Sequence, residues 1–272
     1  LSTRLDKHTK TYSIGFDEPG YDEMDYARLA SRHFGTEHHE YYVTRRNVAD
    51  LIPKISKAYE EPFGNSSAVP TYFCAQLAGQ DGVQRMVAGD GGDELFGGNA
   101  RYSNQLIYSY YDKLPTRLKK SLIRTVAGSL PLRFFFTRKI RRYVEQAEIP
   151  MPMRMFSYNH LRMLGEERIL HPDFLARVNR EGPETDLSEV YNSADAQNMI
   201  DRMLALDMKF TITDNDLPKV VTMCDLAGRD VVFPFLMDEM IEFSTALPPE
   251  MKVRRNKLRV FFKEALRDFL PE

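Results

Sequence analysis

An acidic, glycine-rich segment at residues 87–102 (VAGDGGDELFGGNARY) holds the residues of this chain that are best suited to chemistry. A short run of apolar and small residues leads into it, and Asp90, Asp93 and Glu94 lie among its glycines. A loop that binds phosphates directly carries Lys or Arg, whereas carboxylates repel a polyphosphate unless Mg²⁺ lies between them. The segment therefore indicates a loop for a metal-bound nucleotide.

Two common phosphate-binding motifs do not fit this loop. A Walker loop needs Gly-Lys-Ser/Thr after its second glycine, and a dinucleotide fingerprint needs a third small residue where Glu94 follows Gly89-x-Gly91-x-x. An isolated acidic turn is by default a surface turn with solvated carboxylates. The rest of the chain must therefore decide between a surface turn and a loop for a metal-bound nucleotide.

Strand and helix patterns alternate in the first hundred residues. Apolar spacing predicts strands at residues 9–16, 37–44 and 83–88, and helices at residues 21–34, 47–59 and 67–77, with Pro53 expected to kink or shorten the second helix. This order predicts an α/β fold with a mostly parallel sheet and flanking helices, whose ligand crevice lies at the carboxyl ends of the strands. The acidic loop falls at such an end.

Beyond residue 104 the pattern is helical. Apolar residues recur at helical spacing in residues 105–111, 114–126, 195–210 and 235–245, while Asp214, Asn215 and Asp216 before Leu217-Pro218 indicate a capping turn. We therefore expect an α/β nucleotide-binding part at residues 1–103 and a mostly helical part at residues 104–272.

The composition excludes several classes of protein. The chain has 272 residues, and its 43% hydrophobic content with a mean hydropathy of −0.44 argues against a membrane protein. Its 37 Lys and Arg against 39 Asp and Glu give no general basic field for nucleic acid. Cys74 and Cys224 lack partners at metal-ligand or disulfide-framework spacing, which predicts reduced thiols in a cytoplasmic protein.

The acidic loop resembles a family signature. GDGGDELFGG followed by Arg101-Tyr102 is similar to the SGxGxDExFGGYxRY pattern of the asparagine synthetase domain, an ATP-pyrophosphatase of the adenine nucleotide α-hydrolase-like fold. Four further segments match in the family's order: TYSIGF (11–16) with TFSIGF, FGTEHH (34–39) with LGTxHHE, EEP through SAVP (60–70) with DEPxxxxSAxP, and PFL (234–236) with PFLD.

The resemblance implies ATP-dependent amide formation. Members adenylate a carboxylate, aspartate in the type enzyme, with MgATP, release pyrophosphate, and convert the acyl-adenylate to an amide with ammonia. The expected cofactors are thus ATP and Mg²⁺, and the expected partners are a small carboxylate substrate and ammonia from a glutaminase domain, with a homodimer left open. Neither nucleic acid nor membrane is expected as a partner.

The resemblance also assigns roles to residues of the loop. Asp90 matches an acidic residue, often Glu, that assists proton removal from ammonia, although Asp reaches about one methylene less far. Asp93 matches the metal- and pyrophosphate-associated Asp, and Glu94 is expected beside the metal. Four positions match the nucleotide site: Ala88, Gly89, Ile14 and Gly15.

A cationic run near the C-terminus supplies the remaining catalytic candidates. In the family, a Lys at the start of the final helix contacts the phosphates, and the following KEAL residues place Arg259 at that position, with Lys257 as a rival. Arg keeps the charge and changes its geometry. A charge run is otherwise a solvated helix face.

The chain departs from the family in three places. The SGGxDS pyrophosphate loop is absent, and so is the glutaminase domain with its nucleophilic Cys, so we interpret the chain as truncated and expect the fragment to be inactive alone. Around PFL (234–236), the charged residues of the family are replaced by Val221, Thr222, Val232 and Met237, and Asp230 replaces Glu. The alternatives are a changed acceptor or a catalytically inactive relative that acts as a binding or assembly module. A tRNA-modifying member of the same ATP-pyrophosphatase class is disfavoured by the charge pattern.

Overall fold

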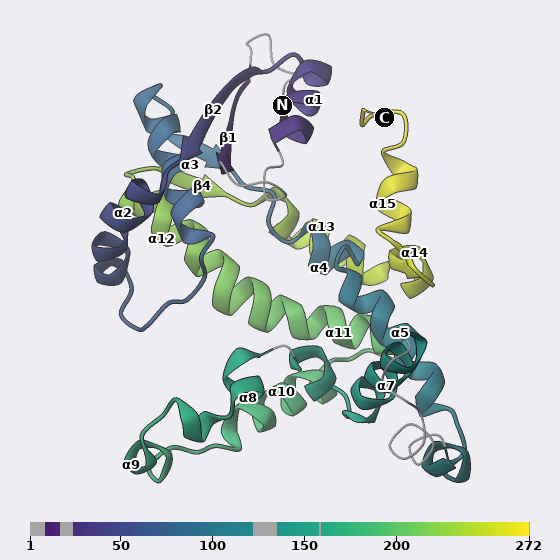
Figure 1. Ribbon diagram of the computed structural model, residues 1–272. Helices are drawn as coiled ribbons and strands as arrows, with labels where there is room; N and C mark the ends of the chain where they lie inside the picture. The colour runs from purple at the N-terminus through teal and green to yellow at the C-terminus, as the bar shows by residue number, and fades with distance from the viewer. Residues whose placement is uncertain (1–8, 17–23, 122–134, 158, 272) are drawn as a thin grey trace. The chain divides into compact units, whose positions relative to one another are not determined.

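A computed structural model describes residues 9–16, 24–121, 135–157 and 159–271 (Figure 1). The chain folds into two compact units. The first comprises Leu1–Gly92, Phe210–Ser244 and Phe262–Glu272, and the second comprises Asp93–Lys209 and Thr245–Phe261. The division at residue 103 that the sequence suggests stays a prediction.

Parallel strand pairs form the sheet structure of the first unit. β1 (Lys10–Phe16) pairs in parallel with β2 (Glu37–Val43), and β3 (Arg85–Val87) pairs in parallel with β4 (Asp230–Val232). The three strands predicted in the first hundred residues are therefore confirmed. They lie in two separate pairs in the described part of the chain, and β4 adds a strand to a half of the chain that was expected to be helical.

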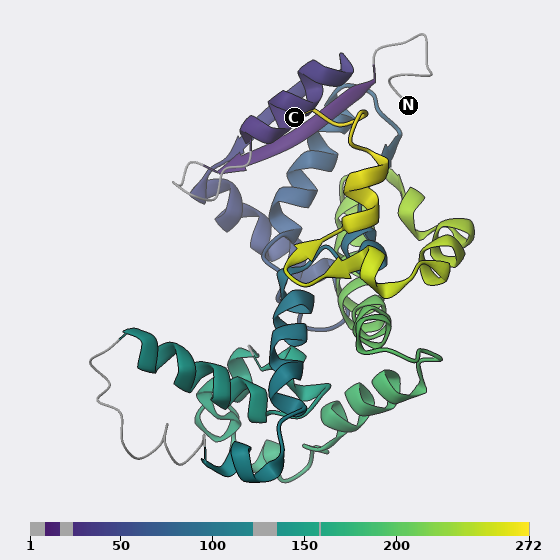
Figure 2. The same ribbon diagram turned by 90° about the vertical axis from the view of Figure 1, so that its right-hand side faces the viewer.

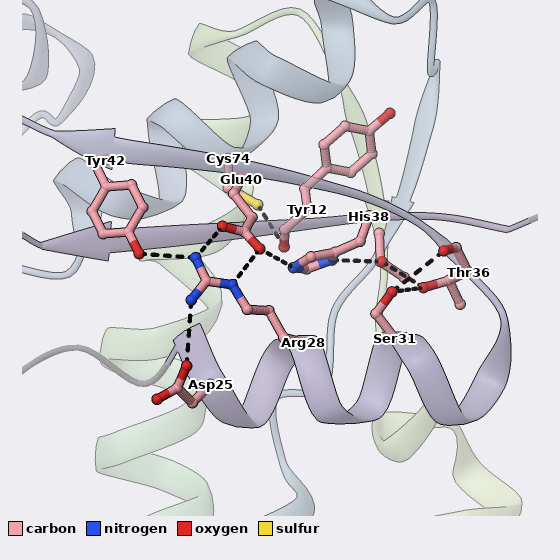
Figure 3. Close-up of polar contacts among 10 residues, drawn as sticks. Tyr12, Asp25, Arg28, Ser31, Thr36, His38, Glu40, Tyr42 and Cys74 are labelled. Carbon is pink, nitrogen blue, oxygen red and sulfur yellow. Dashed lines mark hydrogen bonds and ion pairs between the residues drawn. The ribbon is translucent and has the colours of Figure 1, made fainter.

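Helix α1 (Met24–Phe34) lies along the β1–β2 pair, as Figure 2 shows. Its Arg28 donates two hydrogen bonds to the carboxylate of Glu40 on β2, at 2.8 Å from Nε and 2.6 Å from a terminal nitrogen (Figure 3). A second set of polar contacts links His38 Nδ1 to Thr11 Oγ1 at 2.9 Å and Thr11 Oγ1 to Thr36 Oγ1 at 2.9 Å. The Arg28–Glu40 bonds hold α1 on β2, and the Thr11 contacts link β1 to β2 and to the residue that precedes β2.

Three further helices enclose the apolar core of the first unit: α2 (Arg45–Ala58), α3 (Ala68–Gln80) and α12 (Leu217–Leu226). α3 packs against α12 in the structure (Figure 1), and the small, fully buried Ala75 of α3 allows close contact with Val220 and Cys224. α2 continues through Pro53 to Ala58, so the shortening that was predicted as one effect of this proline does not occur. Pro53 is exposed, so water can replace the backbone hydrogen bond that it lacks.

The second unit is mostly helical. Its longer helices are α5 (Ala100–Asp112), α7 (Phe135–Glu148), α10 (Gly182–Ser193) and α11 (Met199–Asp207). Tyr102 and Asp207 are both fully buried, and the Tyr102 hydroxyl donates to Asp207 Oδ2 at 2.6 Å. Arg101 also reaches Asp207 Oδ2, at 2.8 Å, so the Arg-Tyr pair that ends the acidic segment anchors α5 to α11.

The remaining elements are short. They are α4 (Gly92–Phe96), α8 (His160–Leu164), α9 (Pro172–Leu175), α13 (Asp238–Ala246), α14 (Pro249–Lys252), α15 (Val260–Ala265), the antiparallel strands β5 (Val253–Arg254) and β6 (Lys257–Leu258), and three 3₁₀ turns at Met153–Phe156, Glu166–Arg168 and Pro234–Leu236. The α/β fold with a mostly helical C-terminal half is thus confirmed. Part of the helix predicted at 114–126 lies outside the described residues.

The predicted capping turn at residues 214–216 is wrong. These residues belong to a π-helix, Met208–Asp216, that leads directly into α12, and Asp216 keeps helical dihedral angles. A π-helix adds residues to a turn and is often found at functional sites.

None of the helices in the described part of the chain is both long and apolar enough to cross a membrane.

Candidate functional site

A pocket of about 340 Å³ lies at the carboxyl end of β3 in the first unit. It is lined by Ile14 of β1 and by Ala88 and Asp90, which follow β3. The Ala88 amide donates to the carbonyl oxygen of Val232 at 2.9 Å, so the strand pairing extends one residue into the loop. The structure therefore brings together three of the residues that the sequence indicated.

Two predicted nucleotide-site glycines do not line this pocket among the described residues. A Cβ at Gly15 would lie 2.5 Å from Cε1 of Tyr42, so the glycine admits the neighbouring ring. At Gly89 a Cβ would meet nothing within 4 Å. Packing accounts for Gly15, and the contacts of Gly89 give no reason for a glycine there.

The Asp90 carboxylate faces a cation that sequence reasoning missed. Lys219 Nζ lies 4.0 Å from Asp90 Oδ1 and 2.8 Å from Asp216 Oδ1. The side chains of Lys219 and Asp90 are 12% and 21% exposed. Burial raises the pKa of Asp90, Lys219 opposes this rise, and the negative charge of Asp216 adds to it.

One sequence signal could have pointed to Lys219. It follows Asp216 by three residues, a spacing that brings opposite charges together on a helix. Because the region was interpreted as a capping turn, these side chains were not placed on one helical face.

Two free thiols also line the pocket. Cys74 of α3 and Cys224 of α12 are unpaired, as the sequence predicts, and burial raises the pKa of each to about 11. Cys74 donates a weak hydrogen bond to the Tyr12 carbonyl oxygen at 3.7 Å. Thiols with such pKa values are protonated at neutral pH, so these two side chains form part of the apolar wall of the pocket.

A second group of predicted residues meets in the second unit. Arg259 Nε donates to Asp93 Oδ1 at 2.8 Å, and a terminal nitrogen of the same guanidinium donates to the same oxygen. Arg259 has φ of 52°, and its amide donates to the Gly97 carbonyl oxygen at 3.3 Å. Both charged side chains are 40% exposed, so they remain open to solvent.

The geometry distinguishes the two cations proposed from sequence. Lys257 lies on β6, where it pairs in register with Arg254, and it is exposed. Arg259 is the one that contacts the acidic segment. A side chain at Gly98 would collide with both Asp93 and Arg259, so this glycine leaves room for the pair.

The carboxylates of the loop differ in their surroundings. Glu94, on α4, is only 7% exposed. Burial raises the pKa of the Tyr102 hydroxyl most, and the negative charges of Asp207 and Glu94 raise it further. Asp93 is far more open to solvent. Asp93 is therefore better placed than Glu94 to meet an incoming cation.

A metal ion would have few protein ligands here. In the described ranges, no three His, Cys, Asp or Glu side chains are arranged to hold a metal ion. Mg²⁺ is commonly bound by one or two carboxylates together with phosphate oxygens and water. The exposed carboxylate of Asp93 fits a Mg²⁺ ion that arrives with phosphates.

A larger apolar pocket of about 1210 Å³ lies elsewhere in the first unit. Ile52 and Ile55 of α2 form part of its wall, and Asn65, in the loop before α3, also lines it. Asn65 Nδ2 donates to Asn215 Oδ1 at 3.1 Å and to Asp216 Oδ1 at 3.4 Å. This amide therefore connects the larger pocket to the partner of Lys219.

Comparisons with known proteins identify the family of this chain. The family model described as Asparagine synthase matches residues 1–272. Asparagine synthetase (glutamine-hydrolyzing) 1 of Bacillus subtilis is 25% identical over 264 residues, which are 97% of this chain and 40% of that protein. A putative asparagine synthetase (glutamine-hydrolyzing) of Mycobacterium tuberculosis is 24% identical over 272 residues, which are 100% of this chain and 40% of that protein.

Local similarity is higher to a third relative. Putative asparagine synthetase (glutamine-hydrolyzing) 2 of Methanocaldococcus jannaschii is 40% identical over 123 residues, which are 45% of this chain and 22% of that protein. The chain thus spans two fifths or less of the length of each of these relatives. With a family model that covers its whole length, this chain belongs to the asparagine synthase family.

Proposed function

We propose that this chain is the synthetase part of an amidotransferase that activates a carboxylate with MgATP and joins it to ammonia. The observation that carries the proposal is the pocket at the end of β3, where Ile14, Ala88 and Asp90 meet. Parallel strands present their carboxyl ends to ligands in this way, and a pocket of this volume suits part of a nucleotide.

The first step is adenylation of the acceptor. A carboxylate oxygen attacks the α-phosphorus of ATP, a new P–O bond forms, and the bond to the leaving pyrophosphate breaks with its electron pair on pyrophosphate. Arg259 is the residue of this chain that stabilises the developing negative charge, since its guanidinium is a fixed cation with several donors. When bound, Mg²⁺ supplies charge neutralisation at the phosphates, with Asp93 as its protein ligand.

The second step is amide formation. Ammonia attacks the activated carbonyl carbon, a C–N bond forms, and the C–O bond to AMP breaks with its electron pair on AMP. The nitrogen must also lose a proton. Asp90 accepts that proton, because burial makes its carboxylate a stronger base than an exposed Asp. The proton then passes to water.

The proposal assigns the production of ammonia to residues other than those of this chain. The relatives named above are glutamine-hydrolyzing enzymes, and this chain matches two fifths or less of each. We therefore propose that a glutaminase part of the same protein delivers ammonia.

A non-catalytic binding or assembly module is the second candidate. It is favoured by the exposure of Val221, Val232 and Met237, apolar residues at positions where the resemblance leads one to expect charge. Exposed apolar side chains suit a protein partner better than a charged substrate. Nucleotide binding discriminates between the two candidates.

The test uses the product of the complete reading frame. MgATP should raise its thermal unfolding midpoint, and ATP–pyrophosphate exchange should appear when a carboxylate acceptor is added without ammonia. Acceptors tested should include aspartate and carboxylates with apolar bodies, because the larger pocket is apolar. Exchange with aspartate would make asparagine synthesis the working function, and exchange with another carboxylate would redefine the acceptor. Absence of MgATP binding would contradict the enzyme proposal and favour the module.

A further inference from the structure

Lys219 is the most enclosed cation at the candidate site. It lies in the first turn of α12, and its side chain is 12% exposed. Its ammonium approaches two carboxylates, Asp216 Oδ1 at 2.8 Å and Asp90 Oδ1 at 4.0 Å. The ammonium therefore lies beside the acidic loop in a largely enclosed position.

Asp216 holds Lys219 in this position. Its Oδ1 accepts from Lys219 Nζ and also from Asn65 Nδ2, at 2.8 and 3.4 Å. An ammonium has three donors, so binding Asp216 leaves others for Asp90 or a water between them. The Asn65–Asp216–Lys219 chain therefore fixes one charge in front of Asp90.

Asp90 needs such a fixed partner because of its own backbone. It lies between Gly89 and Gly91, and Gly91 adopts a positive φ of 93°. Glycines on both sides give the loop conformational freedom, whereas Lys219 extends from a packed helix. The ammonium can hold a carboxylate that the loop alone would leave variable in direction.

We propose that Lys219, held by Asp216 and Asn65, is a positioning residue that orients the Asp90 carboxylate for proton removal from ammonia. The inference rests on the proposed function, in which Asp90 is the base. Its charge also counteracts the cost of an ionised Asp90 in a half-buried pocket, in agreement with its effect on the pKa of that group.

The experiment compares two half-reactions of the complete protein. Adenylation is measured by ATP–pyrophosphate exchange, and amide formation by single turnover after ammonia is added to the preformed adenylate. Lys219→Met removes the charge at nearly the same volume, and Lys219→Arg keeps it. Lys57→Met is the matched control, because Lys57 is exposed on α2 and does not line either pocket.

The two half-reactions should respond differently. We expect Lys219→Met to slow amide formation at least about 10-fold and exchange less than about 3-fold, with partial recovery in Lys219→Arg. The double variant Lys219→Met/Asp90→Asn should be no slower in amide formation than Asp90→Asn alone. Lys57→Met should match the wild type in both.

Four results would overturn the inference. A raised KM for MgATP with equal losses in both half-reactions would make Lys219 a nucleotide ligand, and additive losses in the double variant would separate it from Asp90. If Lys219→Met does not fold, Asp216→Asn must show the same preference for amide formation, or the inference fails. Absence of exchange by the wild type with every acceptor would contradict the proposed function itself, and the inference with it.

Discussion

Asp93 and Arg259 are 166 positions apart in the sequence and form a hydrogen-bonded ion pair within the second unit. Asp93 is the second residue of the short helix α4, which follows the glycine-rich loop, and Arg259 immediately precedes α15. The pair joins the two segments of the chain that the sequence singled out for chemistry. Both side chains are 40% exposed, so a ligand in the solvent can reach them.

Loss of the Arg259 charge should affect catalysis far more than stability. Exposed ion pairs contribute about 0–1 kcal/mol, so Arg259→Met should change the free energy of unfolding by less than about 1 kcal/mol. Removal of a preorganised charge at the phosphates should lower ATP–pyrophosphate exchange roughly 100-fold or more. Urea unfolding and exchange kinetics of the same preparation give both values.

Lys257→Met is the control for this prediction. Lys257 lies on β6 opposite Arg254, so its loss should lower exchange less than the loss of Arg259. The reverse order of the two variants would assign the phosphate contact to Lys257.

A methyl group at Gly98 should separate the same ion pair. Its Cβ would occupy the space of the Asp93 carboxylate and the Arg259 guanidinium, so Gly98→Ala should lower exchange about as strongly as Arg259→Met. The matched control is Gly182→Ala, because a Cβ at Gly182 would meet only the side chain of the exposed Asn179, from 3.2 Å, and Gly182 lines neither pocket. Equal activity of Gly98→Ala and wild type would show that the pair is not required in this geometry.

Local sequence patterns were sufficient to predict most elements of the first hundred residues. The strand at residues 9–16 and the acidic loop after β3 follow from apolar alternation and from the glycine and carboxylate pattern. The pairing of β3 with β4 could not be predicted in this way. β4 has three residues and lies more than 140 positions away, so its pairing depends on tertiary contacts rather than on local periodicity.

The candidate site was predictable only in part for a similar reason. Asp90 and Asp93 stand in a distinctive motif, whereas Lys219 has an ordinary helical context. Its proximity to Asp90 depends on the π-helix that continues into α12, and Asp214-Asn215-Asp216 resembles a turn when no packing is considered. Short polar residues favour turns locally, but the surrounding helices determine the outcome.

Replacement of Asp90 should stabilise the protein while it removes the proposed base. Burial raises the folded-state pKa of Asp90 above its ordinary value of 3.8, so folding favours the protonated carboxyl. The folded protein therefore loses stability as the pH rises from about 3.8 through the folded-state pKa. Asp90→Asn should therefore increase the free energy of unfolding at pH 7 by roughly 0.5–2 kcal/mol, as is common when a functional group is removed. Lys219 keeps its partner Asp216 in this variant.

The pH dependence provides the control for Asp90→Asn. The stabilisation, measured by urea unfolding, should shrink as pH falls toward 4, since the wild-type carboxyl becomes neutral there. Lys219 and Cys224 of α12 and Asp216 of the π-helix are titratable groups that interact electrostatically with Asp90, and Cys74 of α3 lines the same pocket. A destabilised Asp90→Asn at pH 7 would show that its ionised form supports the fold.

The stability contributed by the Arg28–Glu40 pair (Figure 3) should increase with pH, whereas the effect of Asp90 on stability has the opposite pH dependence. Hydrogen bonds from Arg28 lower the pKa of Glu40 below its ordinary value of 4.5. A lowered folded-state pKa gives stability that is present above about pH 4.5 and is lost as pH falls through the folded pKa. Glu40→Gln should therefore cost roughly 0.5–1 kcal/mol at pH 7, and the deficit should close below pH 4.5. The control is Glu264→Gln, at an exposed position of α15, which should not lower the free energy of unfolding at either pH. If the loss of stability in Glu40→Gln persists in acid, it comes from packing rather than from charge.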